Sequence, residues 1–396
     1  MTLRRYSQPD IKDKKVLLRL DLDVDVNEKG IVDEYHDLRL ERAVGTVQEL
    51  LSFGPKQIIM CGHRGRPDFA KASSGKPATE FSLEPVRDRL EFLLNKAGVR
   101  AKIDLISDIN VPVSTSSQLV MLENLRFWPG EKNNDPDFAR LLSAWGEVYV
   151  NDAFGNSHRA DASMVGAAQI IKYSFAGPGL AEEIINQEKF LNNLGNPFVL
   201  ILGGVKISTK LPLIKKFIHR ADYVLLGGGL ANTVLKSRGL AVGLSVVEES
   251  MINEAKALNQ DNIVLPDDFI VLNKKSDIIA VESHKIGLED YILDIGPKTL
   301  KKYQDLIKDA ESILWNGPMG KFEDKAASEG TMEIAQAMAA AKGNTLAGGG
   351  ETVIVLERLN LLGQFDFVSA GGGAMLTFLA GEPMPALDVL SSRPTQ

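Results

Sequence analysis

Residues 177–197, GPGLAEEIINQEKFLNNLGNP, lie close to the middle of the 396-residue chain and separate two halves of different character. Glycine and proline at 177–179 interrupt whatever precedes the segment, and Gly195 and Pro197 end it. Apolar residues recur at nearly helical spacing from Leu180 to Leu194. The alternative is an ordinary surface helix of one large domain. Because the chain is long for a single core, we predict a helix that connects two domains.

The composition is that of a soluble globular protein, with 44% hydrophobic and 24% charged residues. A net charge of −7 argues against general affinity for nucleic acid or acidic membranes, so an anion site requires a local concentration of positive charge. The single cysteine, Cys61, excludes an internal disulfide framework. Neither a signal-type segment nor a long apolar run is present. We expect a cytoplasmic protein whose partners are small molecules, with no nucleic acid and no membrane.

The first half alternates short apolar runs with stretches of helical spacing. This alternation predicts an α/β fold, in which a parallel sheet is covered by helices. The predicted strands are 15–20, 57–61, 102–106, 118–122 and 147–150, and the predicted helices are 38–53, 83–96 and about 136–144.

Charged and basic side chains follow the predicted strands of this half. In chain order they are Arg19, Asp21, Arg39, His63, Arg64, Arg66, Arg126, His158 and Arg159. Ligands bind at the carboxyl ends of strands in open α/β sheets, and the arginine fork suits carboxylate or phosphate oxygens. One such arginine is more often a solvated or ion-paired side chain. Several at one sheet edge predict a small-anion site, and the histidines lack the spacing of metal ligands.

The second half repeats the order strand, glycine cluster, helix. The clusters are Gly203–Gly204, Gly227–Gly229, Gly348–Gly350 and Gly371–Gly373, with a fifth case in SILWNGPMG at 312–320. Glycine lets backbone N–H groups approach a ligand, and the following helix offers its positive end to phosphate. One cluster alone is usually only a tight turn. Five predict a nucleotide crevice, although neither the phosphate-loop motif nor the dinucleotide fingerprint is present.

Four charged residues lie beside these turns. Lys206 and Lys210 are four residues apart and share one face if helical, or they are solvated surface lysines. Glu323 and Glu351 suit ribose hydroxyls or Mg²⁺, or they are ordinary acids at helix N-termini. A lobe for a small anion and a lobe for a nucleotide together suit phosphoryl transfer, in which catalysis is positioning plus charge stabilisation.

A series of long motifs now points to a known family. The motifs are LLRLDLDV, HRGRP, LENLRF, VNDAFGNSHRAD, LGGVKIS, DIGPKT, WNGPMGKFE, GGGETV and AGGGAML, in this order over nearly the whole chain. They strongly resemble phosphoglycerate kinase. The resemblance implies two Rossmann-like lobes with parallel sheets, joined by a central helix and hinge. It also implies Mg²⁺-dependent, reversible transfer between 1,3-bisphosphoglycerate and ADP, giving 3-phosphoglycerate and ATP.

The expected domains are an N-terminal phosphoglycerate-binding lobe (1–176), an interdomain helix (177–197), a C-terminal nucleotide-binding lobe (198–379) and a tail that packs back on the N-terminal lobe (380–396). We expect a monomer. The resemblance implies substrate binding by Asp21, Asp23, Arg39, His63, Arg64, Gly65, Arg66, Arg126, His158 and Arg159. It implies nucleotide binding by Gly204, Lys206, Lys210, Gly228, Asn316, Pro318, Glu323, Gly349, Gly350, Glu351 and Thr352. The implied catalytic residues are Arg39, Lys206, Lys210, Gly350 and Gly373, and the implied metal ligand is Glu351.

Several positions depart from the family pattern. They are Asp23 and Asp25 for asparagine and proline, Thr209 for aspartate, Glu351 for aspartate, and Ala370 and Met375 for hydroxyl residues. Two alternatives therefore stay open beside phosphoglycerate kinase activity. One is a kinase of the same fold acting on a different small acid or alcohol, and the other is a nucleotide-binding homologue with weak or no turnover.

Overall fold

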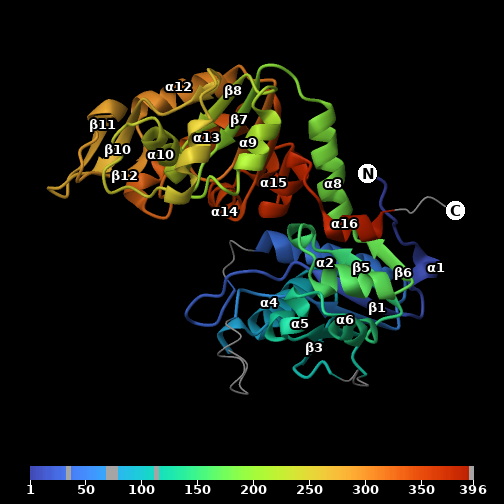
Figure 1. The fold of residues 1–396 in the computed structure, drawn as a ribbon. Helices are drawn as coiled ribbons and strands as arrows, with labels where there is room; N and C mark the ends of the chain where they lie inside the picture. Colours follow the sequence, from blue (N-terminus) through green and yellow to red (C-terminus); the bar gives the residue numbers. More distant parts are fainter. Residues whose placement is uncertain (33–36, 68–78, 111–115, 392–396) are drawn as a thin grey trace. The chain divides into compact units, whose positions relative to one another are not determined.

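The computed structural model describes residues 1–32, 37–67, 79–110 and 116–391, which fall into two compact units (Figure 1). The first unit contains Met1–Ile185 together with the segment from Pro383 onward, and the second contains Asn186–Glu382. The point of division lies inside helix α8 (Pro178–Asn192). The sequence pattern predicted that this helix ends at Gly195 and Pro197. In the structure it ends at Asn192, five residues before Pro197.

The first unit is built on a six-stranded parallel sheet with strand order β3-β4-β2-β1-β5-β6. The strands are β1 (Lys15–Leu20), β2 (Gln57–Cys61), β3 (Ile103–Ile106), β4 (Leu119–Leu122), β5 (Val148–Asp152) and β6 (Tyr173–Ala176). The five predicted strands are therefore present within two residues of their expected ends, and β6 was not predicted. The order places β1 at the centre, between β2 and β5, so the loops that follow these three strands are neighbours.

The central strands of this sheet are buried on both sides, as expected for a parallel sheet that is covered on both faces. Alternate residues such as Val16 and Leu18 pack into one core with α2 (Asp37–Ser52) and α4 (Glu84–Lys96). The intervening residue Leu17 is equally buried and faces away from that core. The other α-helices described in this unit are α1 (Gln8–Ile11), α5 (Pro129–Lys132), α6 (Pro136–Ser143), α7 (Ala167–Ile170) and α16 (Pro385–Leu390).

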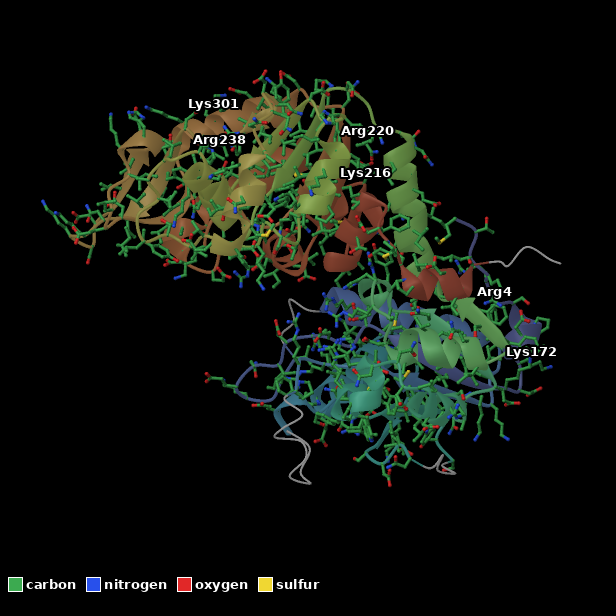
Figure 2. All side chains as sticks on the ribbon, in the orientation of Figure 1. Arg4, Lys172, Lys216, Arg220, Arg238 and Lys301 are labelled. Atoms are coloured by element: carbon green, nitrogen blue, oxygen red, sulfur yellow. The ribbon has the colours of Figure 1, made fainter. Side chains whose placement is uncertain are left out.

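The C-terminal helix α16 belongs to the first unit. The backbone N–H of Arg4 donates to Leu390 O at 3.1 Å, and the Arg4 guanidinium, labelled in Figure 2, donates to Val389 O at 2.7 Å. The N–H of Ala386 donates to Ser157 O at 3.2 Å. These bonds join the last helix to Arg4 near the beginning of the chain and to Ser157.

The N-terminus of α8 is held by Asp152 at the end of β5. Its carboxylate accepts a hydrogen bond from the N–H of Leu180 at 2.7 Å, as expected for an acid at a helix N-terminus. A Cβ at Gly177 or Gly179 would lie 2.4 or 3.1 Å from this carboxyl group. Glycine at these positions therefore allows the strand and the helix to approach each other closely.

The second unit contains a six-stranded parallel sheet with order β15-β14-β13-β7-β8-β9. Its strands are β7 (Phe198–Leu202), β8 (Tyr223–Leu226), β9 (Ile263–Val264), β13 (Ser312–Asn316), β14 (Asn344–Gly348) and β15 (Phe367–Ser369). Its helices are α9 (Leu211–Phe217), α10 (Gly228–Ser237), α11 (Ile252–Lys256), α12 (Pro297–Lys308), α13 (Glu329–Ala339), α14 (Gly350–Arg358) and α15 (Gly373–Ala380). The five glycine turns all follow strands of this sheet.

A second, antiparallel sheet in this unit was not predicted. It has the order β11-β10-β12 and contains β10 (Asp268–Leu272), β11 (Ile278–Glu282) and β12 (Tyr291–Ile295). Its core residues, among them Phe269 and Val271, pack with Leu235 of α10. Among the helices that the structure describes, none is both long enough and apolar enough to cross a membrane.

Candidate functional site

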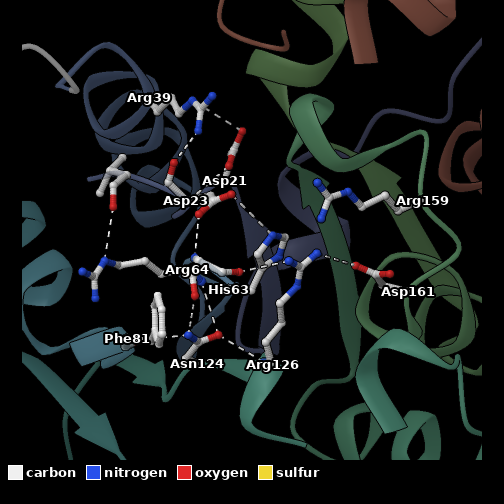
Figure 3. Close-up of polar contacts among 12 residues, drawn as sticks. Asp21, Asp23, Arg39, His63, Arg64, Phe81, Asn124, Arg126, Arg159 and Asp161 are labelled. Carbon is white, nitrogen blue, oxygen red and sulfur yellow. Dashed lines mark hydrogen bonds and ion pairs between the residues drawn. The ribbon is translucent and has the colours of Figure 1, made fainter. Parts of the chain in front are cut away.

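The polar residues of the first unit gather where β1, β2 and β5 end, together with the short 3₁₀ turn Leu125–Phe127 after β4 (Figure 3). The loop after β2 is fixed by Asn124, which is fully buried. Its Oδ1 accepts from the N–H groups of Arg64 (3.2 Å) and Arg126 (3.1 Å), and its Nδ2 donates to Arg64 O (2.7 Å) and Phe81 O (2.8 Å). One amide thus uses all of its hydrogen-bonding capacity on the backbones of Arg64, Arg126 and Phe81.

Asp23 closes the loop after β1 onto the loop after β2. Its Oδ1 accepts from the N–H of Gly65 at 2.7 Å, and its Oδ2 lies 3.8 Å from His63 Nε2. Gly65 has a positive φ of 64°, and a Cβ there would lie 2.3 Å from the Phe81 ring. Only glycine therefore permits the loop after β2 to approach the Phe81 ring this closely.

Arg39 on α2 reaches back to the same loop. Its Nη1 donates to the backbone carbonyl of Asp23, and its Nε lies 3.8 Å from Asp21 Oδ2. These two contacts hold the guanidinium beside the carboxylates while leaving other N–H groups for a ligand. About a quarter of the side chain is exposed.

A cavity of about 430 Å³ opens beside this cluster and is lined by Arg66, Pro67, Arg126, Lys132, Arg159 and Asp161. Arg126 Nη1 donates to Gly65 O at 3.0 Å, and Nη2 lies 3.7 Å from Asp161 Oδ2. Among the described residues, the buried Arg126 Nε has no hydrogen-bond partner. Burial lowers the pKa of Arg126, and the neighbouring Arg159 lowers it further. An anion in this cavity would offset both effects.

The structure brings together Asp21, Asp23, Arg39, His63, Gly65, Arg66, Arg126 and Arg159. All of them follow strands except Arg39, which comes from α2. His158 borders them, since Arg159 Nε lies 3.5 Å from His158 Nε2. Burial lowers the pKa of His158 and Arg159 lowers it further, while Asp161 and Asp21 raise it.

The expectation for Arg64 needs correction. Its guanidinium donates to the backbone carbonyls of Val24 (3.2 Å), Glu80 (2.6 Å) and Ser82 (3.2 Å). Arg64 is buried and does not line the cavity. Its side chain therefore supports neighbouring loops, and its geometry does not present it to a ligand.

Three residues that belong to this site were missed. Asn124 and Asp161 lie inside the motifs LENLRF and VNDAFGNSHRAD, so a buried amide and an acid beside arginines could have been suspected. Lys132 lies on α5 and lines the cavity. Nothing in the sequence distinguishes it from an ordinary surface lysine.

In the second unit, the glycine turns after β7, β8 and β13 pack against one another. A Cβ at Gly203 would lie 2.0 Å from Pro318 O, one at Gly317 would lie 2.7 Å from Gly203 O, and one at Gly228 would lie 2.9 Å from Gly204 O. These glycines are explained by contacts between backbones. By contrast, a Cβ at Gly350 meets nothing within 4 Å, and one at Gly204 first meets Lys210 Nζ at 3.5 Å. The backbone at these two positions therefore has open space beside it.

A cavity of about 420 Å³ adjoins these turns. Of the predicted residues, Gly204, Gly228, Pro318, Glu323 and Glu351 line it. Much of its apolar wall comes from residues that were not predicted, namely Val205, Val246, Tyr291–Leu293, Met319 and Phe322. Part of this wall could not be read from the glycine pattern, because Tyr291–Leu293 come from β12 and Val246 follows α10.

Other predicted nucleotide residues lie beneath the turns. Asn316 donates through Nδ2 to Gly348 O at 2.6 Å, and Thr352 Oγ1 accepts from the N–H of Gly317 at 2.9 Å. Both residues are buried, so these side chains brace the turns. Gly349 has a φ of 113°, a conformation that favours glycine. Gly373 begins α15.

Lys206 and Lys210 are not in a helix, contrary to one of the two expectations for them. Both precede α9, and Lys206 is exposed whereas Lys210 is buried. Burial lowers the pKa of Lys210, while Glu351 and Glu248 raise it. The carboxylate of Glu248 holds this loop by accepting from Ser208 N at 3.0 Å and Ser208 Oγ at 2.6 Å.

Glu351 lies close enough to Glu323 and Lys210 to feel both charges. Desolvation raises the pKa of Glu351, Glu323 raises it further, and Lys210 lowers it. No group of three or more metal-ligating side chains occurs among the residues that the structure describes. A hard cation here would therefore need ligands from elsewhere, as Mg²⁺ does when it arrives with a nucleotide.

Comparison with known proteins bears on both units. The family model described as "Phosphoglycerate kinase" matches residues 6–382. The phosphoglycerate kinase of Legionella pneumophila (strain Corby) is 38% identical over 402 residues, covering 99% of this chain and 98% of its own length. That of Desulfosudis oleivorans is 37% identical over 392 residues, covering 96% and 97%.

Solved structures agree with these matches. The structure of phosphoglycerate kinase from Coxiella burnetii superposes with a TM-score of 0.76 at 34% identity, covering 96% of this chain and 97% of that one. The corresponding structure from Pyrococcus horikoshii OT3 gives a TM-score of 0.82 at 27% identity, covering 98% of each chain.

Proposed function

The chain belongs to the phosphoglycerate kinase family, and from this premise we propose that it transfers a phosphoryl group reversibly between 1,3-bisphosphoglycerate and ADP, giving 3-phosphoglycerate and ATP. It is then a phosphotransferase with a carboxyl acceptor, acting in glycolysis and gluconeogenesis. The observation that carries the proposal is the family match over residues 6–382, which spans both cavities.

The first cavity suits the acid substrate. Arg66, Arg126 and Arg159 line it, and an arginine fork can hold phosphate oxygens in a defined orientation. The unpartnered Arg126 Nε is a further donor in this unit. In this proposal, Lys132 contributes positive charge, Asp21 accepts a hydrogen bond from a substrate hydroxyl group, and Asp23 borders the bound acid.

Arg39 is the proposed catalytic arginine. The backbone carbonyl of Asp23 and the carboxylate of Asp21 orient its guanidinium before substrate arrives. A guanidinium held in this way can stabilise the charge that spreads over the oxygens of a phosphoryl group during transfer.

The second cavity suits the nucleotide. Its apolar wall would take the base, Glu323 would accept from the ribose, and the backbone beside Gly204 and Gly350 would approach the phosphates. In this proposal, Lys206 and Lys210 neutralise phosphate charge, and Gly373 supplies backbone N–H groups from the start of α15.

The proposal includes Mg²⁺ bound with ATP or ADP. Glu351 fits this ion, because a cation would relieve its repulsion with Glu323 and Mg²⁺ commonly takes one or two carboxylates plus phosphate oxygens. When bound, the ion would neutralise charge on the nucleotide phosphates. We further propose that the protein works as a cytoplasmic monomer and that the segment around α8 serves as its hinge.

A coupled assay with MgATP and 3-phosphoglycerate tests the proposal, with Arg39→Ala as the inactive partner and Arg140→Ala as the control. Arg140 is an exposed arginine that pairs with the nearby Asp137. Turnover that Arg39→Ala abolishes and Arg140→Ala preserves is the expected result. The assay is repeated with glycerate and other small acids, because Asp23 adds a negative charge to the acceptor site. Faster turnover on another acid would assign a different acceptor, and MgATP binding without turnover would indicate a non-catalytic homologue.

A further inference from the structure

Arg19 on β1 is fully buried, yet it does not line either cavity. Its Nη2 lies 2.8 Å from His63 Nδ1, its Nη1 donates to the backbone carbonyl of Leu20, and its Nε donates to Ser163 Oγ at 2.8 Å. A buried arginine whose guanidinium is divided among three partners is expensive to keep in an interior. The burial of this charged side chain therefore suggests a functional role for Arg19 in addition to packing.

The contact with His63 determines where the ring carries its proton. Arginine has only donors and keeps its charge at any relevant pH, so the His63 Nδ1 at the other end of this 2.8 Å contact is the acceptor. A neutral ring that accepts at Nδ1 has its hydrogen on Nε2. The position of this proton thus follows from the chemistry of the partner.

The charges around His63 keep the ring neutral. Burial lowers its pKa well below the usual range, and the guanidinium groups that face it lower it further; these are Arg19, Arg126, Arg159 and Arg39. Asp23 is the opposing charge, but its Oδ2 is 3.8 Å from Nε2 and is partly solvated, with 38% of the side chain exposed. Four positive charges and burial outweigh this one carboxylate. The pair is therefore not an ion pair.

Ser163 and Glu131 hold the guanidinium of Arg19 at its Nε. Ser163 Oγ donates its single hydrogen to Glu131 Oε1 at 2.6 Å, so it can only accept from Arg19 Nε. The N–H of Ser163 also donates to Glu131 Oε2 at 2.9 Å. Ser163 and Glu131 are both buried. Along this chain of bonds, Ser163 donates to Glu131, and Arg19 donates to both Ser163 and His63.

We propose that Arg19 is a positioning residue that holds His63 in the neutral tautomer with its proton on Nε2, so that the ring donates a hydrogen bond to the acid substrate and does not act as a base. Among the described residues, the buried His63 Nε2 has no hydrogen-bond partner, so the neutral ring holds an unsatisfied donor beside the arginines of this site. The inference rests on the proposed function only for the identity of that ligand. The tautomer itself is a property of the unliganded protein.

Nitrogen-15 NMR of the wild-type protein with labelled histidine tests the tautomer directly. The chain has five histidines, and the His63 signals are assigned by their loss in His63→Gln. The expected spectrum shows protonated Nε2 and unprotonated Nδ1 that persist between about pH 5.5 and pH 8. A proton on Nδ1, or titration to imidazolium within this range, would overturn the proposal without the need for any Arg19 variant.

Variants then test whether Arg19 is the cause. Arg19→Met removes the donor and its charge, so His63 should titrate closer to its ordinary range, and the KM for 3-phosphoglycerate should rise about tenfold while the KM for MgATP is unchanged. Ser163→Ala should raise the same KM by a smaller factor. Ser174→Ala, which alters another buried serine of this unit, is the matched control.

Unchanged His63 signals in folded Arg19→Met would remove Arg19 from the explanation, and equal KM values in Ser163→Ala and Ser174→Ala would remove Ser163. These outcomes differ from failure of the proposed function. If 3-phosphoglycerate is not the substrate, all variants lack turnover on it while the wild-type tautomer is still observed.

Discussion

The carboxylate of Asp23 accepts a hydrogen bond from the backbone N–H of Gly65 at 2.7 Å, which joins the loop after β1 to the loop after β2. The same carboxylate places a negative charge 3.8 Å from His63, beside the cavity proposed for an anionic substrate. One side chain thus stabilises the shape of the site and opposes the charge of its ligand.

Asp23→Asn should strengthen binding of 3-phosphoglycerate. The amide oxygen can keep the bond to Gly65 while the repulsion disappears, and one charge removed at this range corresponds to about a tenfold lower KM. Steady-state kinetics measure the change, with Asp25→Asn, an exposed carboxylate two residues away, as the control. An unchanged or higher KM in Asp23→Asn would show that the carboxylate is needed for a substrate hydroxyl.

Two positions near the nucleotide cavity offer a separate test. Glu351→Asp shortens a carboxylate beside Glu323, and Thr209→Asp adds one beside Lys210. Both changes alter the oxygen ligands available near the phosphates, where the geometry around Mg²⁺ is demanding. If the present residues reflect drift from the family pattern, each variant should raise the turnover number with 3-phosphoglycerate several-fold. Variants no faster than the parent would favour a different acceptor.

The pH dependence of stability should reveal Asp294. This buried residue of β12 accepts from Gly330 N at 2.7 Å and Ile295 N at 2.9 Å. Burial raises its pKa from 3.8 to about 7, and Glu329 adds to the shift. Because the folded state holds this proton more tightly than the unfolded state, the stabilisation is complete below the unfolded pKa and is lost as pH rises toward and through 7.

The expected loss between about pH 5 and pH 8 is on the order of 2 kcal/mol. Urea denaturation followed by tryptophan fluorescence measures it, since Trp315 is buried in the second unit. Asp294→Asn should remove this dependence, whereas Asp290→Asn, at a partly buried acid near the start of the same strand, should retain it. A wild-type stability that is flat over this range would contradict the assignment.

The glycine turns can be tested by adding one methyl group. Gly203→Ala should destabilise the second unit by several kcal/mol and weaken MgATP binding, because its Cβ would meet Pro318 O at 2.0 Å. Gly45→Ala is the contrasting variant. Gly45 lies within α2, its Cβ would meet nothing within 4 Å, and the change should stabilise the first unit by about 0.5–1 kcal/mol. Calorimetry measures both, and equal effects would contradict the packing described for the turns.

The parts of the fold that the sequence predicted are those with a strong local pattern. The first two strands, Lys15–Leu20 and Gln57–Cys61, agree with the predicted ranges because a central parallel strand is apolar on both faces. The antiparallel sheet was missed because its edge strand, Ile278–Glu282, is largely exposed and lacks a buried face to give a pattern.

The contacts that side chains make were harder to predict than the ends of the strands. Arg64 and Arg66 belong to the same HRGRP motif, yet Arg64 turns to backbone carbonyls and Arg66 lines the cavity. The difference depends on Glu80 and Ser82, which are distant in the sequence. Likewise, the sequence placed Arg19 at a strand end but could not show that it contacts His63, since that contact requires β1 and β2 to be neighbours.

The most direct test of the central claim is ³¹P NMR of the purified protein with MgADP and 1,3-bisphosphoglycerate. The account predicts that the acyl phosphate signal decreases while the γ-phosphate signal of ATP appears at the same rate, and that Arg39→Ala slows this transfer by a factor on the order of 10³. Loss of the acyl phosphate without ATP formation, or equal rates in Arg39→Ala and wild type, would contradict it.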